Sequence, residues 1–205
     1  MNKYISIFFC VQIIALNLFA MQPKVTPVDY VRPQIDTHKS RWFFFSSASR
    51  PFGMVSLSPD TWTEGSWNSG YLYNSKEIRC FSHVHCWQLA GVPVMPTTGE
   101  VKGHKGMDAY KSTYSHETEI VKPGYHKVEL DTYQIRVELT STSRVGMHRY
   151  TYPAGEKANV LFDVGALLAH GKTEKAAIHR ISSKEIGGYS VLAPTSRRKK
   201  PVTVY

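Results

Sequence analysis

The chain has 205 residues, a formal net charge of +9 and an isoelectric point of about 9.4. Its length is typical of a single domain. The positive charge raises the possibility of nucleic-acid binding, but much of the excess lies in Arg197–Lys200 and no nucleic-acid-binding motif accompanies it. We interpret the basic run as a solvated loop and expect no nucleic-acid partner.

The first twenty residues resemble a targeting segment more than part of a folded domain. Lys3 precedes the mostly apolar stretch Ile5–Leu18, and Ala20 supplies a small residue for cleavage. This pattern predicts a signal peptide at residues 1–20, a domain at 21–205, and a secreted or periplasmic protein. The apolar stretch is short and interrupted, so we expect no membrane span. An uncleaved anchor is the alternative.

Removal of the signal peptide would leave Cys80 and Cys86 as the remaining cysteines. Their even separation on one strand would put both thiols on one face, beyond comfortable disulfide reach. We therefore expect two free thiols rather than a bridge. The spacing also differs from the C-x-x-C pattern of structural zinc sites.

The first predicted strand is Met54–Ser58, which is followed by a predicted turn at Pro59-Asp60-Thr61. The loop Thr61–Ser69 is rich in small polar residues and carries Trp62 and Trp67. Two indoles in such a loop have two interpretations, which are anchoring of the core and stacking on a sugar. The sequence leaves both open.

The segment Cys80–Glu100 brings together two histidines, a tryptophan and a Gly/Pro break. If Ile78–His85 is one extended strand, His83 and His85 lie on one face about 7 Å apart. Beside Trp87, such a pair suits a site that binds hydroxyl groups. A buried, hydrogen-bonded pair that supports a loop is the alternative, and the residues alone favour it.

The remaining strands are short and alternate or run apolar, and no segment predicts an amphipathic helix. Gly70–Tyr73 and Ile78–His85 are expected to pair, Tyr125–Leu130 and Gln134–Leu139 are expected to form a hairpin, and Asn159–Val164 is expected to be buried. Further strands are predicted at Val145–Tyr152, Ala176–Ser182, Ile186–Ala193 and Val202–Tyr205. This series predicts an all-β, antiparallel β-sandwich. The last strand stops at Tyr205, so we expect a sandwich that is incomplete at its C-terminus.

Eight stretches, taken in order, resemble a known family. They are Arg50-Pro-Phe-Gly-Met-Val55, Leu57-Ser-Pro-Asp-Thr61, Trp67-Asn-Ser-Gly-Tyr71, Phe81-Ser-His-Val-His85, Val94-Met-Pro-Thr-Thr-Gly-Glu100, Tyr114-Ser-His-Glu117, Pro123-Gly-Tyr125 and Val145-Gly-Met-His-Arg-Tyr-Thr151. Together they look like the N-terminal domain of glycoside hydrolase family 92, the calcium-dependent exo-α-mannosidases. Each stretch is weak alone, and eight in register are specific.

The resemblance implies a β-sandwich of the galactose-mutarotase or supersandwich kind, followed by a C-terminal (α/α)₆ catalytic domain. It implies exo-hydrolysis of α-1,2-type mannosides in mannose-containing glycans, such as N-glycans, with inversion. An acid and a base about 6.5–9.5 Å apart would carry the reaction. These carboxylates and the calcium ligands are expected on the C-terminal domain, so the chain alone is expected to be inactive and to bind no calcium.

The resemblance also assigns one wall of the sugar pocket to this chain. Mapped by motif, the wall draws on Gly53, Trp67, Asn68, and the Phe81–Trp87 stretch with His83, His85 and Trp87. An indole face stacks on a pyranose, and histidine or asparagine bonds its hydroxyl groups. For each histidine, support of the loop is an alternative to direct contact.

This sequence departs from the family pattern at Lys39–Ser49 and at Cys86–Gly91. Both changes would line the pocket, so the preferred linkage cannot be carried over. Two other functions are kept open. A stand-alone carbohydrate-binding sandwich would use Trp62, Trp67 and Trp87, and a zinc hydrolase would use His83 and His85 but lacks an evident third ligand.

Overall fold

The computed structural model describes residues 25–38, 48–63, 70–86, 89–90, 92–166, 171–196 and 198–205, with residues 86, 89 and 90 described for their backbone only. The chain divides into two units, Met1–Val31 and Arg32–Tyr205. The described part of the first unit holds the 3₁₀ helix η1 (Pro27–Tyr30). The Asp29 carboxylate accepts hydrogen bonds from the backbone and hydroxyl of Thr26 and so caps this helix. The signal peptide predicted at residues 1–20 lies outside the described residues.

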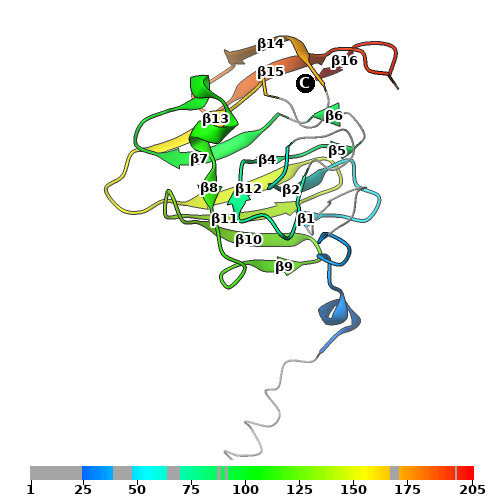
Figure 1. The fold of residues 1–205 in the computed structure, drawn as a ribbon, viewed down its shortest axis with the longest axis vertical. Coiled ribbons are helices and arrows are strands. Elements are labelled where there is room, and N and C mark those ends of the chain that lie inside the picture. Colours follow the sequence, from blue (N-terminus) through cyan, green and yellow to red (C-terminus); the bar gives the residue numbers. More distant parts are fainter. Residues whose placement is uncertain are drawn as a thin grey trace, which may run out of the picture. The chain divides into compact units, whose positions relative to one another are not determined.

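The second unit is built on a five-stranded antiparallel sheet in the order β1-β2-β4-β7-β13 (Figure 1). Its strands are β1 (Ala48–Ser49), β2 (Ser56–Asp60), β4 (Cys80–Ser82), β7 (Val94–Thr98) and β13 (Ala158–Phe162). β2 and β4 are almost entirely buried, so this sheet is covered on both faces near its centre. The two histidines of the candidate site, His83 and His85, lie just after the end of β4.

A four-stranded antiparallel sheet lies beneath it, in the order β12-β11-β10-β9. Its strands are β9 (Ile120–Lys122), β10 (Tyr125–Leu130), β11 (Ile135–Ser141) and β12 (Gly146–Thr151). Alternate residues of β10 and β11 are buried, and Val128 faces Val137 across the hairpin. The pairing of β10 with β11 confirms the predicted hairpin. Its residues alternate with period two because one face of the sheet is buried and the other is exposed to solvent.

The main core fills the space between these two sheets. Leu57, Phe81 and Met95 come from the five-stranded sheet. They belong to the same buried cluster as the inward residues of the β10–β11 hairpin, which are Val128, Leu130, Ile135, Val137 and Leu139. Each such side chain contributes about 1.5–3 kcal/mol relative to an exposed position. This packing is the sandwich that the sequence predicts.

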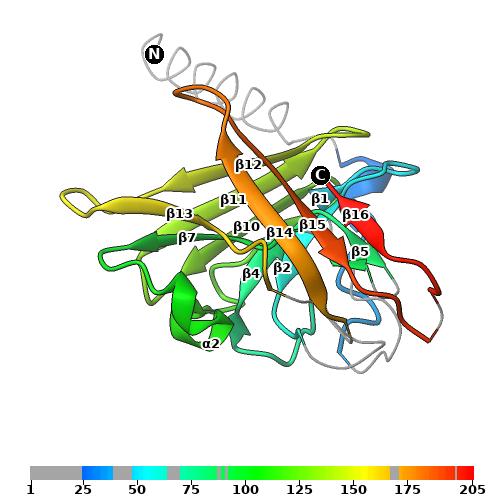
Figure 2. The same ribbon diagram turned by 90° about the horizontal axis from the view of Figure 1, so that it is seen from above.

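A third sheet covers part of the other face of the five-stranded sheet (Figure 2). It has the order β14-β15-β16, with β14 (Thr173–Arg180), β15 (Ile186–Leu192) and β16 (Val202–Val204). Leu192 packs on Cys80, and Val204 packs against that pair. The second unit also contains two small ribbons, β3 (Glu77–Ile78) with β8 (Ser112–Thr113) and β5 (His85–Cys86) with β6 (Leu89–Ala90), and the short helices η2 (Gly103–Lys105) and α2 (Met107–Tyr110). Among the described residues, no helix is long and apolar enough to cross a membrane.

One prediction around β2 is wrong. Pro59 and Asp60 belong to β2 instead of a turn, and they pair with Phe81 and Cys80. The backbone of Ser56 and Asp60 bonds toward β4, so the nitrogen of Pro59 faces the β1 side. Among the described residues, β1 pairs with Ser56 and Leu57 and does not reach Pro59.

The expected pairing of Gly70–Tyr73 with Ile78–His85 is also wrong. The Thr61 hydroxyl binds both the amide and the carbonyl of Leu72 at 2.7 and 3.1 Å, in place of a strand ladder. Ile78 pairs instead with Ser112 of β8. Strand β13 forms where expected, but Val160 and Phe162 on it are exposed rather than buried. In the described part of the chain, β13 is the last strand of its sheet.

Candidate functional site

Strand β4 ends at Ser82, and the chain bends at His83 and Val84 before β5 begins at His85. The expectation of one continuous strand through His85, with both histidines on a shared face, is therefore wrong. The His83 carbonyl accepts the Ser56 amide at 2.8 Å, and the His85 ring reaches the Ser56 carbonyl at 2.5 Å. One residue of β2 thus holds the bend through both of its backbone groups.

His85 lies in a buried polar cluster around Asp60. Its Nε2 is 2.6 Å from Asp60 Oδ1 and 3.0 Å from the Ser82 hydroxyl. Ser82 donates to Asp60 Oδ2 at 2.7 Å, and the Cys80 thiol donates to the same oxygen at 3.3 Å. The side chains of His85 and Asp60 are 3% and 0% exposed. Each lone pair of this buried carboxylate that the protein satisfies reduces the cost of burying it.

The contacts of His85 favour its charged form. Burial lowers the pKa of His85, but the Asp60 carboxylate and the Ser56 carbonyl outweigh burial and raise it above its usual value. Both ring nitrogens face acceptors, so both donate, as an imidazolium does. The result is a buried ion pair that joins β2 to the segment after β4.

This cluster has the residue types of a serine–histidine–aspartate triad but not the arrangement of one. In a triad, the carboxylate and the hydroxyl bind opposite nitrogens of the imidazole. Here Asp60 and Ser82 lie on the same nitrogen, and Ser82 is fully buried. The geometry suits support of the bend and gives no exposed nucleophile.

Cys80 carries a free thiol, as expected, and burial together with the Asp60 charge raises its pKa. The side chain of Cys86 lies outside what the structure describes.

His83 belongs to a second cluster that sequence analysis missed. Its Nε2 is 2.9 Å from Nε2 of His148 on β12, and the Tyr150 hydroxyl is 2.7 Å from His148 Nδ1. One proton occupies the contact between the two rings, so one ring donates and the other accepts. Burial lowers the pKa of His148 to about 3, with His83 adding to the effect. Burial and the His85 charge also lower the pKa of His83.

The position of the His83 ring depends on a glycine in β12. A side chain at Gly146 would collide with the ring of His83 and would touch Leu57. The signal for this cluster was present in the motif Val145–Thr151, where the alternate positions 146, 148 and 150 hold glycine, histidine and tyrosine. Period-two alternation puts these three on one face of a strand.

Gly53 lies on a protruding loop beside the turn between β11 and β12. The Met54 amide donates to the Ser143 carbonyl at 2.7 Å, and a side chain at Gly53 would meet Arg50 and Ser143 backbone atoms. Phe52 has a φ of 58° and a fully exposed ring. A bulky residue in the left-handed region costs free energy, and such residues concentrate at functional sites.

A third polar cluster, also missed by sequence analysis, surrounds Glu119. Its carboxylate accepts hydrogen bonds from Tyr71, Gln34, His116 and His126 at 3.0, 3.1, 2.6 and 2.9 Å. Burial raises the pKa of Glu119, but these bonds, led by His126, bring it below its usual value. The sequence signal was His126 at an inward position of an alternating strand. Because its partners are distant in sequence, the cluster ties the segment before β1 to β10.

Three residues predicted to bind sugar, Trp67, Asn68 and Trp87, lie outside the described residues. The structure brings the His83 carbonyl and the His85 ring to the backbone of Ser56, three residues after Gly53. Within the described part of the chain, no group of three or more His, Cys, Asp or Glu side chains could hold a metal ion. The zinc hypothesis gains no support, and the calcium prediction stays a prediction.

The N-terminal domain of glycosyl hydrolase family 92 matches residues 30–205 of this chain. The chain belongs to this family. Among solved structures, the family GH92 α-mannosidase BT3965 from Bacteroides thetaiotaomicron is 33% identical, with a TM-score of 0.76 over 84% of this chain and 24% of its own. A second structure of BT3965, in complex with mannoimidazole, gives a TM-score of 0.72 at 33% identity, over 80% of this chain and 23% of its own.

The inverting GH92 mannosidase BT2199 of the same organism is 23% identical with a TM-score of 0.68, over 83% of this chain and 23% of its own, and supports the fold. No curated protein matches the chain. The chain thus spans about a quarter of the length of the solved family 92 enzymes that it matches. The resemblance drawn from the eight sequence stretches is confirmed.

Proposed function

We propose that this chain forms one wall of the mannose pocket of an α-mannosidase. The observation that carries the proposal is its 33% identity, over 84% of its length, to a family GH92 α-mannosidase. The substrate would be the non-reducing mannose of a mannose-containing glycan, such as an N-glycan, with an α-1,2 linkage and hydrolysis by inversion. The segment at residues 1–20 would direct the protein to the periplasm or the outside of the cell.

The described site supports a division of labour between the two histidines. His83 is only partly buried and follows β4, with its carbonyl bonded to Ser56, so we assign contact with a sugar hydroxyl to His83 rather than to His85. His85 has both ring nitrogens bonded to protein groups and would hold the bend from behind. Trp67, Asn68 and Trp87 would complete the wall, with an indole stacked on the pyranose.

The acid and the base of an inverting glycosidase would lie elsewhere in the enzyme. Among the described residues, the buried carboxylates of Asp60 and Glu119 are each surrounded by donors from the protein. An acid–base pair must face the glycosidic bond from opposite sides with room for water. We therefore assign the pair, and the calcium that would hold the terminal mannose, to a C-terminal (α/α)₆ domain outside this chain.

Calorimetry with mannose and α-mannobiose tests this proposal. The full chain should bind with millimolar affinity, and Trp67→Ala should abolish the heat. Val28→Ala, an exposed apolar change in the first unit, is the control and should leave binding intact. The chain alone should not turn over an aryl α-mannoside. Absence of heat, or turnover by the chain alone, would contradict the proposed role.

A further inference from the structure

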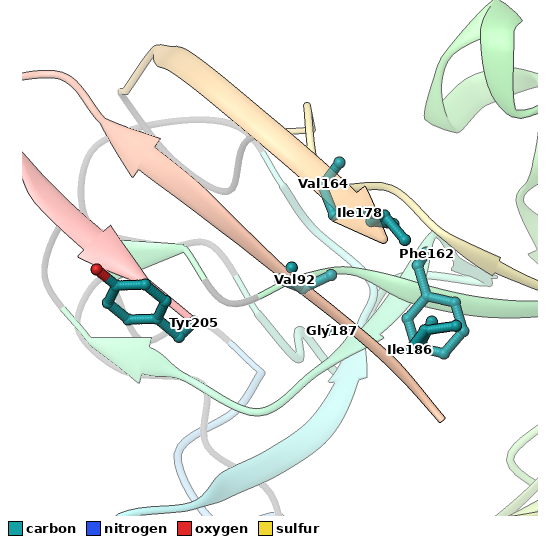
Figure 3. A pocket seen from close by; sticks show the side chains of 8 residues that line it. Val92, Phe162, Val164, Ile178, Ile186, Gly187 and Tyr205 are labelled. Carbon is teal, nitrogen blue, oxygen red and sulfur yellow. The ribbon is translucent and has the colours of Figure 1, made fainter. Parts of the chain in front are cut away.

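An apolar cavity of about 230 Å³ opens between β13 and the β14–β15 hairpin (Figure 3). Its lining is Val92, Phe162, Val164, Ile178, Ile186, Gly187, Gly188 and Tyr205. Among these lining residues, the Tyr205 hydroxyl is the one polar side-chain group. Ligand sites fix their ligands through a few convergent polar groups, and sugars require many. The cavity is therefore unsuited to mannose.

The cavity is part of a larger apolar surface on β13. Leu161 packs into the core, so its neighbours Val160 and Phe162 point to the opposite face of the sheet, where both are exposed. Phe162 on β13 and Ile186 on β15 both line the cavity (Figure 3). The third sheet therefore covers the β4 region through Leu192 but leaves the upper face of β13 open.

Two strand edges border this surface. In the described part of the chain, β13 ends the five-stranded sheet and β14 ends the three-stranded sheet. Such edges present backbone donors and acceptors to a further strand. Gly187 and Gly188 also line the cavity, and Ile181, His179 and the Ala177 carbonyl approach them too closely to leave room for a side chain. An extended segment with apolar side chains would fill the cavity and satisfy an edge.

We propose that this surface docks an extended apolar segment of the family 92 polypeptide from outside the region that this chain matches. The solved relatives are about four times as long as the part that this chain covers, so such polypeptide accompanies the same domain in those enzymes. The proposal rests on the family assignment and gives the proposed function a partner surface. It does not depend on mannose binding.

A binding experiment with the rest of a relative tests the proposal. The probe is BT3965 from which the quarter that matches this chain has been deleted. It is produced as a separate polypeptide and mixed with this full chain. Light scattering should show a one-to-one complex. Ile178→Ser should weaken it about tenfold or more, which corresponds to about 1.4 kcal/mol. Ile120→Ser on β9 is the matched control and should change the affinity less than about twofold, because the two isoleucines are 44% and 39% exposed.

A chimera gives a second readout that does not require the probe to fold alone. This chain replaces the corresponding quarter of BT3965, and thermal midpoints are measured with and without Ile178→Ser. The substitution should lower the midpoint of the chimera and leave that of the chain alone unchanged. Equal effects in both, or an Ile178-dependent dimer of this chain, would overturn the proposal. The heat of mannose binding should be the same in Ile178→Ser as in the wild type. A failure of the docking proposal can then be told apart from a failure of the mannose-binding proposal.

Discussion

At the residue scale, the buried pair Asp60–His85 fixes the bend after β4. Removing one member of such a pair leaves an uncompensated charge in the interior, which typically costs about 3–5 kcal/mol. The pair also bears on pH dependence. The pKa of His85 is raised in the folded protein. The stabilisation that its charge gives the folded state is therefore complete below the pKa of the unfolded state, and it is lost as the pH rises through the pKa of the folded state.

We predict that Asp60→Asn and His85→Gln each lower the free energy of unfolding by about 3 kcal/mol at pH 6. The double variant should lose less than the sum, because the two changes remove one shared interaction. Urea denaturation measures all three. Arg136→Ala is the control, since its ion pair with Glu129 lies at the surface and should be worth less than about 1 kcal/mol. Additive losses in the double variant would show that the pair is not coupled.

His148 gives a pH prediction of the opposite sign. Its pKa is lowered to about 3, so between about pH 6.5 and 3 the unfolded chain binds a proton that the folded chain does not. Stability therefore falls with acidification, by at most about 1.4 kcal/mol per pH unit for this group. His148→Gln should flatten the curve of unfolding free energy against pH in this range. Equal slopes for variant and wild type would contradict a neutral histidine pair.

At the scale of elements, the tight β10–β11 hairpin has a turn residue in an unfavourable conformation. Gln134 has a φ of 54°, which a side chain disfavours by about 1–2 kcal/mol. Gln134→Gly should raise the unfolding free energy by about 0.5 kcal/mol after its greater unfolded-state entropy is subtracted. Thr132→Gly, at a position outside the left-handed region, should lower it. Urea denaturation of both variants measures these changes. A lower free energy of unfolding in Gln134→Gly as well as in Thr132→Gly would show that the turn is not strained.

The same hairpin shows why some elements follow from sequence and others do not. β10 and β11 have one wet face, so alternation predicts them almost to the residue. The end of β4 is set by His85 turning toward Asp60, a residue 25 positions earlier. The ribbon of β3 and β8 joins Ile78 to Ser112. Contacts of this kind depend on the assembled fold, and a local pattern does not contain them.

The candidate site was open to prediction only in part. Family motifs pointed to Gly53, His83 and His85, whose role in binding sugar stays a prediction, and the structure brings the two histidines to Ser56, three residues after Gly53. His148, Tyr150 and the Glu119 cluster were missed, because a polar residue at an inward strand position gains meaning only when its partner is known. The sequence did contain one indication of the Glu119 cluster, which is that His126 falls at an inward position of an alternating strand.

At the scale of the whole molecule, this family 92 domain has two separate candidate surfaces. One is the bend with His83 and Gly53 beside it, proposed to face mannose. The other is the apolar cavity beside β13, proposed to receive polypeptide. Their chemistry differs, because the first offers hydrogen-bonding side chains and the second is almost wholly apolar. The two should therefore respond independently to substitution.

An NMR titration of the full chain with α-mannobiose, following histidine ring and tryptophan indole signals, tests whether the bend after β4 faces mannose. We predict that the signals of His83 and the Trp67 indole shift with millimolar sugar. Those of His126, which is fully buried in the Glu119 cluster, should stay in place. If no histidine or indole signal moves, or if His126 shifts while His83 does not, the bend after β4 is not a wall of a mannose pocket.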